Sequence, residues 1–413
     1  MTAVLHHQLD YEPVRESDHL PALDGLRGVA ILLVMVFHFL PFDEPPTSRV
    51  GGFLFFLASC GWCGVDLFFV LSGFLITRIL LAHKGDPRFF RNFYGRRTLR
   101  IFPLYYFVLI LCFVVLPIIR PSMFTSPDMI ALQHRQGWLW AYAVNIPMAW
   151  HNDLELFRGG LLFFAPFWSL AVEEHFYLIW PTITYLFDRR GLYWVCGLGM
   201  VVSLLLRIWL FHRQNAWAIY ISTPTRVDTL MLGAAIAVLM RGSRAWIPRF
   251  ATLIHWLPWP LGAAWLLINW HDPIRDFLLA ISLGYTLTSL FFASILLRCV
   301  IHPTHSPVLN TKLLRTFGKY SYGLYVYHTL LGPIFEQKIS HTRLQDMYSR
   351  HLQITSGAYT FGVFSHILVA GAISFLIAWL SWQLMEKQVL KLKRYFEYQS
   401  PPPMGTWGEG TRN

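Results

Sequence analysis

The chain has 413 residues, of which 55% are hydrophobic, 16% aromatic and only 14% charged. Because a soluble domain carries about 25% charged residues, this composition excludes a soluble protein and indicates a polytopic membrane protein. The formal net charge of +11 does not indicate nucleic acid, since most lysines and arginines flank apolar stretches, where membrane topology requires them. We therefore expect the lipid bilayer, and no nucleic acid, as a partner.

About ten apolar stretches are long enough, at about 20 residues each, to cross the bilayer as helices. They cover 22–41, 52–82, 100–119, 162–187, 191–211, 227–240, 250–270, 276–298, 316–334 and 358–386. The stretch 227–240 is short and needs its flanking residues to span. The segment Trp138 to Trp150 is apolar but too short, and Asn145 and Pro147 interrupt it, so it should be interfacial or re-entrant. The sequence thus predicts an all-α class, a polytopic membrane helical bundle.

Basic residues are concentrated in alternate connecting loops, as the positive-inside rule requires. The segments assigned to the cytoplasm are 84–100, 189–190, 241–249, 298–315 and 387–394. This alternation predicts that both termini are cytoplasmic, with a tail at 1–21, a transmembrane domain at 22–394 and a disordered tail at 395–413. No basic cluster precedes the first apolar stretch and no small-residue cleavage site follows it, so we expect that span to be retained.

Arg27 and His38 lie eleven residues apart in the first stretch, with no charged residue between them. In a helix this spacing makes about three turns and a rise of about 16 Å, so the two side chains share one face at different depths. An ionisable group inside a membrane costs about 3 kcal/mol and indicates a functional site. The alternative is that Arg27 snorkels to the interface and His38 is a hydrogen-bonded helix histidine.

The second stretch places Asp66 and Ser72 among large apolar residues. A carboxylate there needs a cation, and we expect Arg27 or His38 to supply it, with Asp66 orienting the imidazole. A purely structural polar clasp is the alternative. The nearby Cys60–Cys63 run has the spacing of a redox or metal half-site, but no second Cys or His cluster completes it, so no metal is expected.

The most basic loop leads into the third stretch, where Arg96, Arg97 and Arg100 fall within one and a half helical turns. Guanidinium groups bind phosphate in a bidentate manner, and a helix N-terminus adds partial positive charge. We therefore expect a phosphorylated cytoplasmic cofactor at this loop. The alternative is that the loop anchors the protein to anionic lipid.

The fourth stretch contains Glu173, Glu174 and His175 in its outer part. Adjacent carboxylates point about 100° apart on a helix, so only one of the two can face a cavity.

Two later stretches also carry polar groups. Arg226 and Asp228 lie at the outer end of one of them. Ser321, Tyr325 and His328 lie on one side of the other, since their spacings are four and seven residues.

Together these motifs resemble the acyltransferase-3 family of membrane O-acyltransferases, which acylate carbohydrates of bacterial surfaces and some secreted metabolites. The resemblance covers roughly residues 20–390. It rests on Arg27 with His38, Asp66 through Gly73, the Arg-Arg-x-x-Arg-x-x-Pro-x-Tyr run from Arg96, Trp168 through Tyr177, Arg226 with Asp228, and Ser321 through His328. The chain departs from the family at Glu386–Gln388, where Glu-x-Pro is frequent.

The resemblance implies an integral protein of the bacterial inner (cytoplasmic) membrane that uses acyl-CoA, usually acetyl-CoA, as donor. Arg27, Arg96, Arg97 and Arg100 would bind the phosphates of that donor, and its pantetheine arm would follow the face between Arg27 and His38.

His38 is then expected to act as a general base or, alternatively, as a transient acyl carrier, oriented by Asp66 or Glu173. Five further residues are candidates for polarising the thioester or the substrate: Ser72, Arg226, Asp228, Ser321 and His328.

The expected acceptor is a hydroxyl of a carbohydrate at the outer face, where Trp138, Trp140, Trp150 and Trp168 offer aromatic surfaces. Tryptophan is equally an ordinary membrane-interface anchor. The rival function is a transporter or flippase of a small polar or lipid-linked substrate, but the sequence shows no inverted repeat.

Overall fold

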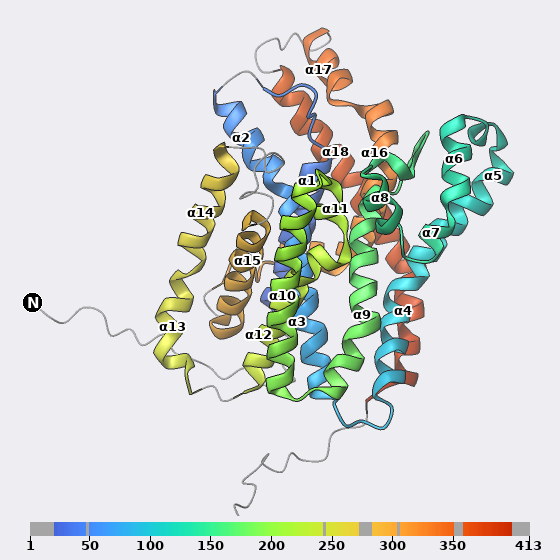
Figure 1. The fold of residues 1–413 in the computed structure, drawn as a ribbon. Helices are drawn as coiled ribbons and strands as arrows, with labels where there is room; N and C mark the ends of the chain where they lie inside the picture. Colours follow the sequence, from blue (N-terminus) through green and yellow to red (C-terminus); the bar gives the residue numbers. More distant parts are fainter. Residues whose placement is uncertain are drawn as a thin grey trace, which may run out of the picture.

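A computed structural model describes residues 20–46, 49–242, 245–271, 283–303, 306–350 and 358–398. Within these ranges the chain is a bundle of α-helices, most of which run in a common direction (Figure 1). The strands among the described residues form one short antiparallel hairpin, β1 (Arg158–Gly159) with β2 (Leu162–Phe163). The predicted all-α class is therefore confirmed.

Each predicted span corresponds to a long helix or to a pair of consecutive helices. These are α1 (Pro21–His38), α2 (Arg49–Ser59) with α3 (Gly64–Ala82), α4 (Phe89–Ile110) with α5 (Leu116–Ile119), α9 (Trp168–Leu186), α10 (Arg189–His212), α12 (Thr223–Arg241), α13 (Ile247–Trp256) with α14 (Pro258–His271), α15 (Gly284–Ile301), α16 (Lys312–Ile339) and α18 (Ala358–Ser381). The first part of the predicted stretch 276–298 lies outside the described residues.

By length and composition, seven helical segments of the described chain can cross a membrane. They are Pro21–His38, Arg49–Ala82, Phe89–Ile119, Arg189–His212, Ile247–Asn269, Gly284–Ile301 and Ala358–Phe396. Three other predicted spans form the helices α9, α12 and α16, which contain the polar residues of the candidate site. These polar residues lower the hydropathy of the three helices, which pack against α3 and α1 in the interior of the bundle.

The segment predicted to be interfacial or re-entrant does not span the bundle. It contains only the short helices α7 (Gly137–Trp140) and α8 (Asn145–His151), which follow α6 (Pro127–Arg135). α6 to α8 and the hairpin gather near one end of the bundle, around the upper part of α9 (Figure 1). The remaining described helices are α11 (Ala216–Ile221), α17 (His341–Arg350) and α19 (Lys387–Leu390).

Glycines allow two helix pairs to approach to backbone contact. On the interface of α3 and α12, a Cβ at Gly73 would meet the Leu230 carbonyl, and a Cβ at Gly233 would meet the Val70 carbonyl. α1 and α16 make a similar approach, because Gly318 faces the backbone of α1. Small residues at helix interfaces permit this packing in membrane proteins.

The basic loops meet at one end of the bundle, which we call the basic end. Lys84 donates from Nζ to the carbonyl of Phe187 at 2.6 Å, so the loop before α4 lies beside the α9–α10 connection. Asn92 donates from Nδ2 to the carbonyl of Glu397 at 3.0 Å, which brings the last described residues to the same end. Residues 395–398, placed by the sequence in a disordered tail, therefore pack on α4 instead.

Candidate active site

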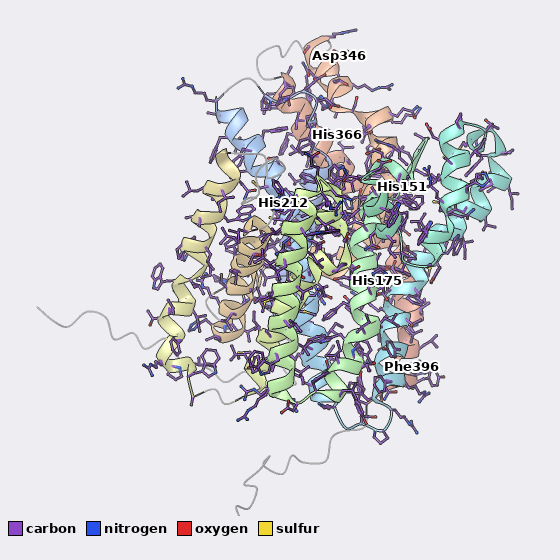
Figure 2. All side chains as sticks on the ribbon, viewed as in Figure 1. His151, His175, His212, Asp346, His366 and Phe396 are labelled. Carbon is purple, nitrogen blue, oxygen red and sulfur yellow. The ribbon has the colours of Figure 1, made fainter. Side chains whose placement is uncertain are left out.

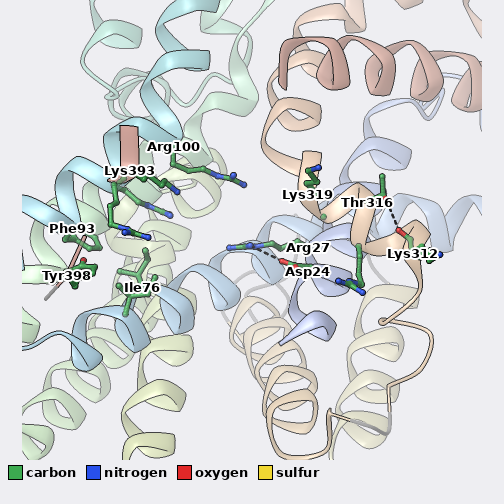
Figure 3. A pocket seen from close by; sticks show the side chains of 15 residues that line it. Asp24, Arg27, Ile76, Phe93, Arg100, Lys312, Thr316, Lys319, Lys393 and Tyr398 are labelled. Carbon is green, nitrogen blue, oxygen red and sulfur yellow. Dashed lines mark hydrogen bonds and ion pairs between the residues drawn. The ribbon is translucent and has the colours of Figure 1, made fainter. Parts of the chain in front are cut away.

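A cavity of about 690 Å³ opens at the basic end. α1 and α16 form one wall, and α4 with residues 391–398 forms the other (Figure 3). We call this space the outer cavity. Its charged lining residues are Asp24, Arg27, Arg96, Arg97, Arg100, Lys312, Arg315, Lys319 and Lys393. All four arginines that the sequence assigned to a phosphorylated cofactor therefore line a single cavity.

Three arginines of α4 form no ion pair with a carboxylate in the part of the chain that the structure describes. Among the described residues, no carboxylate oxygen lies within ion-pair distance of Arg96, Arg97 or Arg100. The guanidinium of Arg97 lies over the ring of Tyr177 at 3.9 Å, and that of Arg100 over Trp382 at 5.4 Å. Such stacking holds a guanidinium plane while leaving its N–H edges available for an anion.

The helix N-terminus expected to assist these arginines lies too far away. α4 begins at Phe89, about two turns before Arg96. Because the field of a helix end falls off within its first turn, the positive charge of the outer cavity comes from its side chains. This corrects the expectation that the helix dipole contributes to the site.

A smaller cavity of about 110 Å³, the inner cavity, lies deeper in the bundle. Arg27, Arg97 and Arg100 line both cavities, and we call these three residues the arginine neck. The Arg27 side chain remains 34% exposed and lies 3.5 Å from Asp24. The arginine neck therefore lies where the outer and the inner cavity adjoin.

Several predicted residues line the inner cavity. They are Ser72, Glu173, Glu174, Ser321 and Tyr325, and Ser169 and Tyr177 line the cavity beside them. Glu173 lies near enough to Arg27 and Arg97 to interact with both electrostatically. The structure therefore associates Glu173 with the neck rather than with His38, the residue it was expected to orient.

Hydroxyl groups from α3, α9 and α16 also line the inner cavity. Ser72 and Tyr177 are hydrogen-bonded to each other through their hydroxyls. The Ser169 and Tyr325 hydroxyls lie 2.5 Å apart, and the Tyr325 hydroxyl also donates to the Pro166 carbonyl at 2.9 Å. These contacts link α3 to α9 and α9 to α16, so the hydroxyl groups are fixed in position.

His38 and His328 lie together at the far end of this row. Nδ1 of His38 is 2.9 Å from the Val34 carbonyl, and Nδ1 of His328 is 2.8 Å from the Leu324 carbonyl. Both Nδ1 atoms must therefore carry hydrogen. Nε2 of His328 lies 3.3 Å from Nδ1 of His38 and can accept the Nδ1 hydrogen of His38. By this assignment, Nε2 of His38 keeps a free lone pair, as a general base requires.

The histidine pair adjoins the inner cavity without lining it. The rings of His328 and Tyr325 are 5.7 Å apart, and Tyr325 lines the cavity whereas His38 and His328 do not. Ser321, Tyr325 and His328 follow one side of α16, as their spacing predicts. The polar residues thus form a row from the neck at Arg27 to the imidazole of His38.

Asp66 does not orient His38. Its carboxylate pairs with Arg226 at 2.5 Å, and both side chains are fully buried. The guanidinium of Arg226 also lies over the ring of Tyr285 at 4.4 Å. Asp228 pairs with Arg207 at 2.7 Å. The expectation that Asp66 pairs with Arg27 or His38 is wrong, and the alternative of a structural clasp describes what the fold contains.

Arg226 and Asp228 are therefore both held in buried ion pairs. Neither residue lines the outer or the inner cavity. Arg207, which the sequence reasoning missed, was visible as a lone arginine within the apolar stretch 191–211. The intramembrane charge argument used for Arg27 applies to Arg207 equally well.

The aromatic partners of the arginines were also missed. Tyr177 and Trp382 support Arg97 and Arg100, and Lys393 and Tyr398 line the outer cavity. Only the fold shows these contacts, because they join residues that are far apart in the sequence. Cys60 and Cys63 are buried free thiols.

Comparisons with known proteins agree on one family. Residues 20–383 match the family described as "Acyltransferase domain". The chain is similar to peptidoglycan O-acetyltransferase OatA of Listeria monocytogenes, with 28% identity over 94% of this chain and 60% of that protein. It is also similar to the putative peptidoglycan O-acetyltransferase YrhL of Bacillus subtilis, with 29% identity over 92% of this chain and 56% of that protein.

O-acetyltransferase OatA of Staphylococcus aureus is 26% identical over 77% of this chain and 51% of its own length. The chain thus spans between half and three fifths of the length of these curated relatives. No solved structure matches it significantly.

Proposed function

Because the chain belongs to the acyltransferase domain family, we propose that it is a membrane O-acyltransferase that transfers an acetyl group from acyl-CoA to a hydroxyl of a carbohydrate. One observation supports this most directly: the unpaired cations of the outer cavity lead through the arginine neck to a row of polar groups that ends at His38. The phosphates of acyl-CoA suit the outer cavity, and its uncharged pantetheine arm suits the narrower passage beyond the neck.

The distances along α1 support this arrangement. Arg27 lies at the neck and His38 is the last residue of α1, so the helix rises about 16 Å between them. A pantetheine arm has a comparable length, so phosphates held at the neck allow the thioester to approach the histidine pair. Ser72 and Ser321 are then candidates for hydrogen bonding along the arm, and Glu173 holds the neck guanidiniums in position.

His38 acts as the base in the transfer step. The acceptor oxygen bonds to the acyl carbonyl carbon while its proton passes to Nε2 of His38. The carbon–sulfur bond then breaks, and the imidazolium returns the proton to the leaving thiolate, which departs as free CoA. His328 is a positioning residue in this proposal, since it accepts the Nδ1 hydrogen of His38 and thereby keeps Nε2 unprotonated.

The basic end faces the cytoplasm in this proposal, because basic loops are retained there. That orientation places both termini in the cytoplasm of a bacterium, with the protein in its inner membrane and acyl-CoA reaching the outer cavity directly. His38 lies toward the opposite end of α1, so the acceptor approaches from the outer face. The relatives named for peptidoglycan make a cell-wall glycan the first acceptor to test.

The test uses purified protein in detergent, acetyl-CoA labelled in the acetyl group, and an oligosaccharide from peptidoglycan. We expect acetyl transfer by the wild type and a loss of about 10²–10⁴-fold in His38→Ala with unchanged affinity for acetyl-CoA, since general-base catalysis contributes that factor. Transfer that persists in His38→Ala would refute the role of His38. Uptake into vesicles without transfer would instead support a transporter. Label retained on the protein without acceptor would show a transient acyl-His38 instead of base catalysis.

A further inference from the structure

Residues 391–398, which we call the C-terminal strap, are held across the first turns of α4. A Cβ at Gly95 would meet the ring of Phe396, so the glycine admits this ring. Asn92 and Arg96 donate to the carbonyls of Glu397 and Phe396, at 3.0 and 3.4 Å. Figure 2 shows Phe396 at the basic end beside α4. The strap is thus fixed by side chains of the helix that carries the cofactor arginines.

Tyr398 completes this attachment. Its ring stacks on His83 at a centroid distance of 3.7 Å with an interplanar angle of 2°, and the guanidinium of Arg96 lies 5.8 Å from it. Burial raises the pKa of the Tyr398 hydroxyl to about 12. The hydroxyl therefore stays protonated at neutral pH and remains a hydrogen-bond donor.

The strap lines only the outer part of the donor site. Lys393, Tyr398 and Arg96 border the outer cavity and not the inner one, whereas the arginine neck borders both. Among the described residues, no carboxylate lies within ion-pair distance of Lys393. Several unpaired cations that face one cavity repel one another, and a bound polyanion relieves that repulsion.

Acyl-CoA has two phosphorylated regions at different distances from its thioester. The diphosphate is joined directly to the pantetheine arm, and the 3′-phosphate is on the ribose beyond it. If the arm passes the neck, the diphosphate lies beside the neck arginines. The 3′-phosphate must then lie farther out, where Lys393 and Tyr398 lie on one side and Lys312 with Lys319 on the other (Figure 3). Arg96 also lines this cavity and lies beside Tyr398.

We propose that the C-terminal strap is part of the donor site and that Lys393 and Tyr398, together with Arg96, bind the ribose 3′-phosphate of acyl-CoA. This inference rests on the proposed function. Three donors, two of them cationic, line the outer cavity from α4 and the strap, and Arg96 is already oriented by the Phe396 carbonyl and the Tyr398 ring. The strap thereby gives the enzyme selectivity for a donor that carries the 3′-phosphate.

The test compares binding of acetyl-CoA and 3′-dephospho-acetyl-CoA to the full chain in detergent. We expect the wild type to prefer acetyl-CoA by at least tenfold, because a charge-assisted hydrogen bond of this kind supports about that ratio. Lys393→Ala should weaken acetyl-CoA binding about tenfold and leave the dephospho compound unchanged, so that the preference falls by the same factor. Tyr398→Phe should reduce the preference by a smaller factor, since it removes one neutral donor.

Two further variants distinguish the effect of removing a charge from the effect of displacing the C-terminal strap. Lys387→Ala removes a lysine of α19 that is exposed and lines neither cavity, and it should keep the wild-type preference. Gly95→Val retains every cation but displaces Phe396, and it should lower the preference as Lys393→Ala does. An unchanged preference in Lys393→Ala, or a preference lost only when Arg315 is replaced by alanine, would overturn the proposal. Failure of the wild type to bind either compound would instead refute the proposed donor.

Discussion

The buried pair of Asp66 and Arg226 provides the sharpest test of the site assignment. Both residues belong to motifs that resemble the acyltransferase-3 family, so a loss of activity on mutation invites a catalytic interpretation. In the structure both side chains are fully buried, with 0% exposure each, and their charged atoms lie 2.5 Å apart. Replacing one partner leaves the other as an uncompensated buried charge.

The expected magnitude follows from that burial. Breaking a buried ion pair costs about 3–5 kcal/mol, whereas replacing both partners with apolar residues is far less harmful. We therefore expect Asp66→Ala to destabilise the protein by about 3–5 kcal/mol, and Asp66→Leu combined with Arg226→Met to recover most of that loss. The matched pair of Arg207 and Asp228 should behave in the same way.

The assay measures thermal unfolding in detergent and, separately, the transfer rate of the fraction that remains folded below the transition. Folded Asp66→Ala protein should bind acetyl-CoA normally and keep a transfer rate within about tenfold of the wild type, since Asp66 lines neither cavity. Normal stability combined with a thousandfold loss of transfer in Asp66→Ala would refute the structural role. Failure of the double variant to recover stability would refute the pairing argument.

Two further outcomes follow from the contacts described above. His328→Ala should lower the transfer rate about tenfold with unchanged acetyl-CoA affinity, because it removes one hydrogen bond that orients His38; an altered pH profile of the rate should accompany the loss, and a change in affinity alone would contradict the positioning role. Gly73→Ala should destabilise the α3–α12 interface by about 1–3 kcal/mol through overpacking, whereas Gly197→Ala, with open space around it, should be neutral or stabilising in the same unfolding assay. Equal stability of the two glycine variants would show that the close approach is unimportant.

Much of the fold could be predicted from the chain without coordinates. Helix formation in a membrane depends on the length and apolarity of local stretches, so the positions of the spans were readable from the sequence. Segregation of basic residues is also a local property, and the loops assigned to one side do meet at one end. The predicted cofactor arginines line one cavity for the same reason, since three of them lie close together in α4.

The partners of the buried charges depended on the tertiary structure. Composition showed that Asp66 needs a cation, but the choice among Arg27, His38 and Arg226 follows from which helices pack together. Gly73 and Gly233 allow α3 to pack closely against α12. That packing places Asp66 beside Arg226. His38 instead meets His328, because α1 packs along α16.

The sequence by itself determined the class of protein, the positions of its helices and the inventory of ionisable groups, because these depend on local composition and period. Only the tertiary structure decided which of those groups neutralise one another and which stay available to a ligand. The reason is physical: an ion pair forms across a few ångströms between residues such as Asp66 and Arg226, which are far apart along the chain. Arg97 and Arg100, which form no ion pair among the described residues, lie with Arg27 at the candidate site.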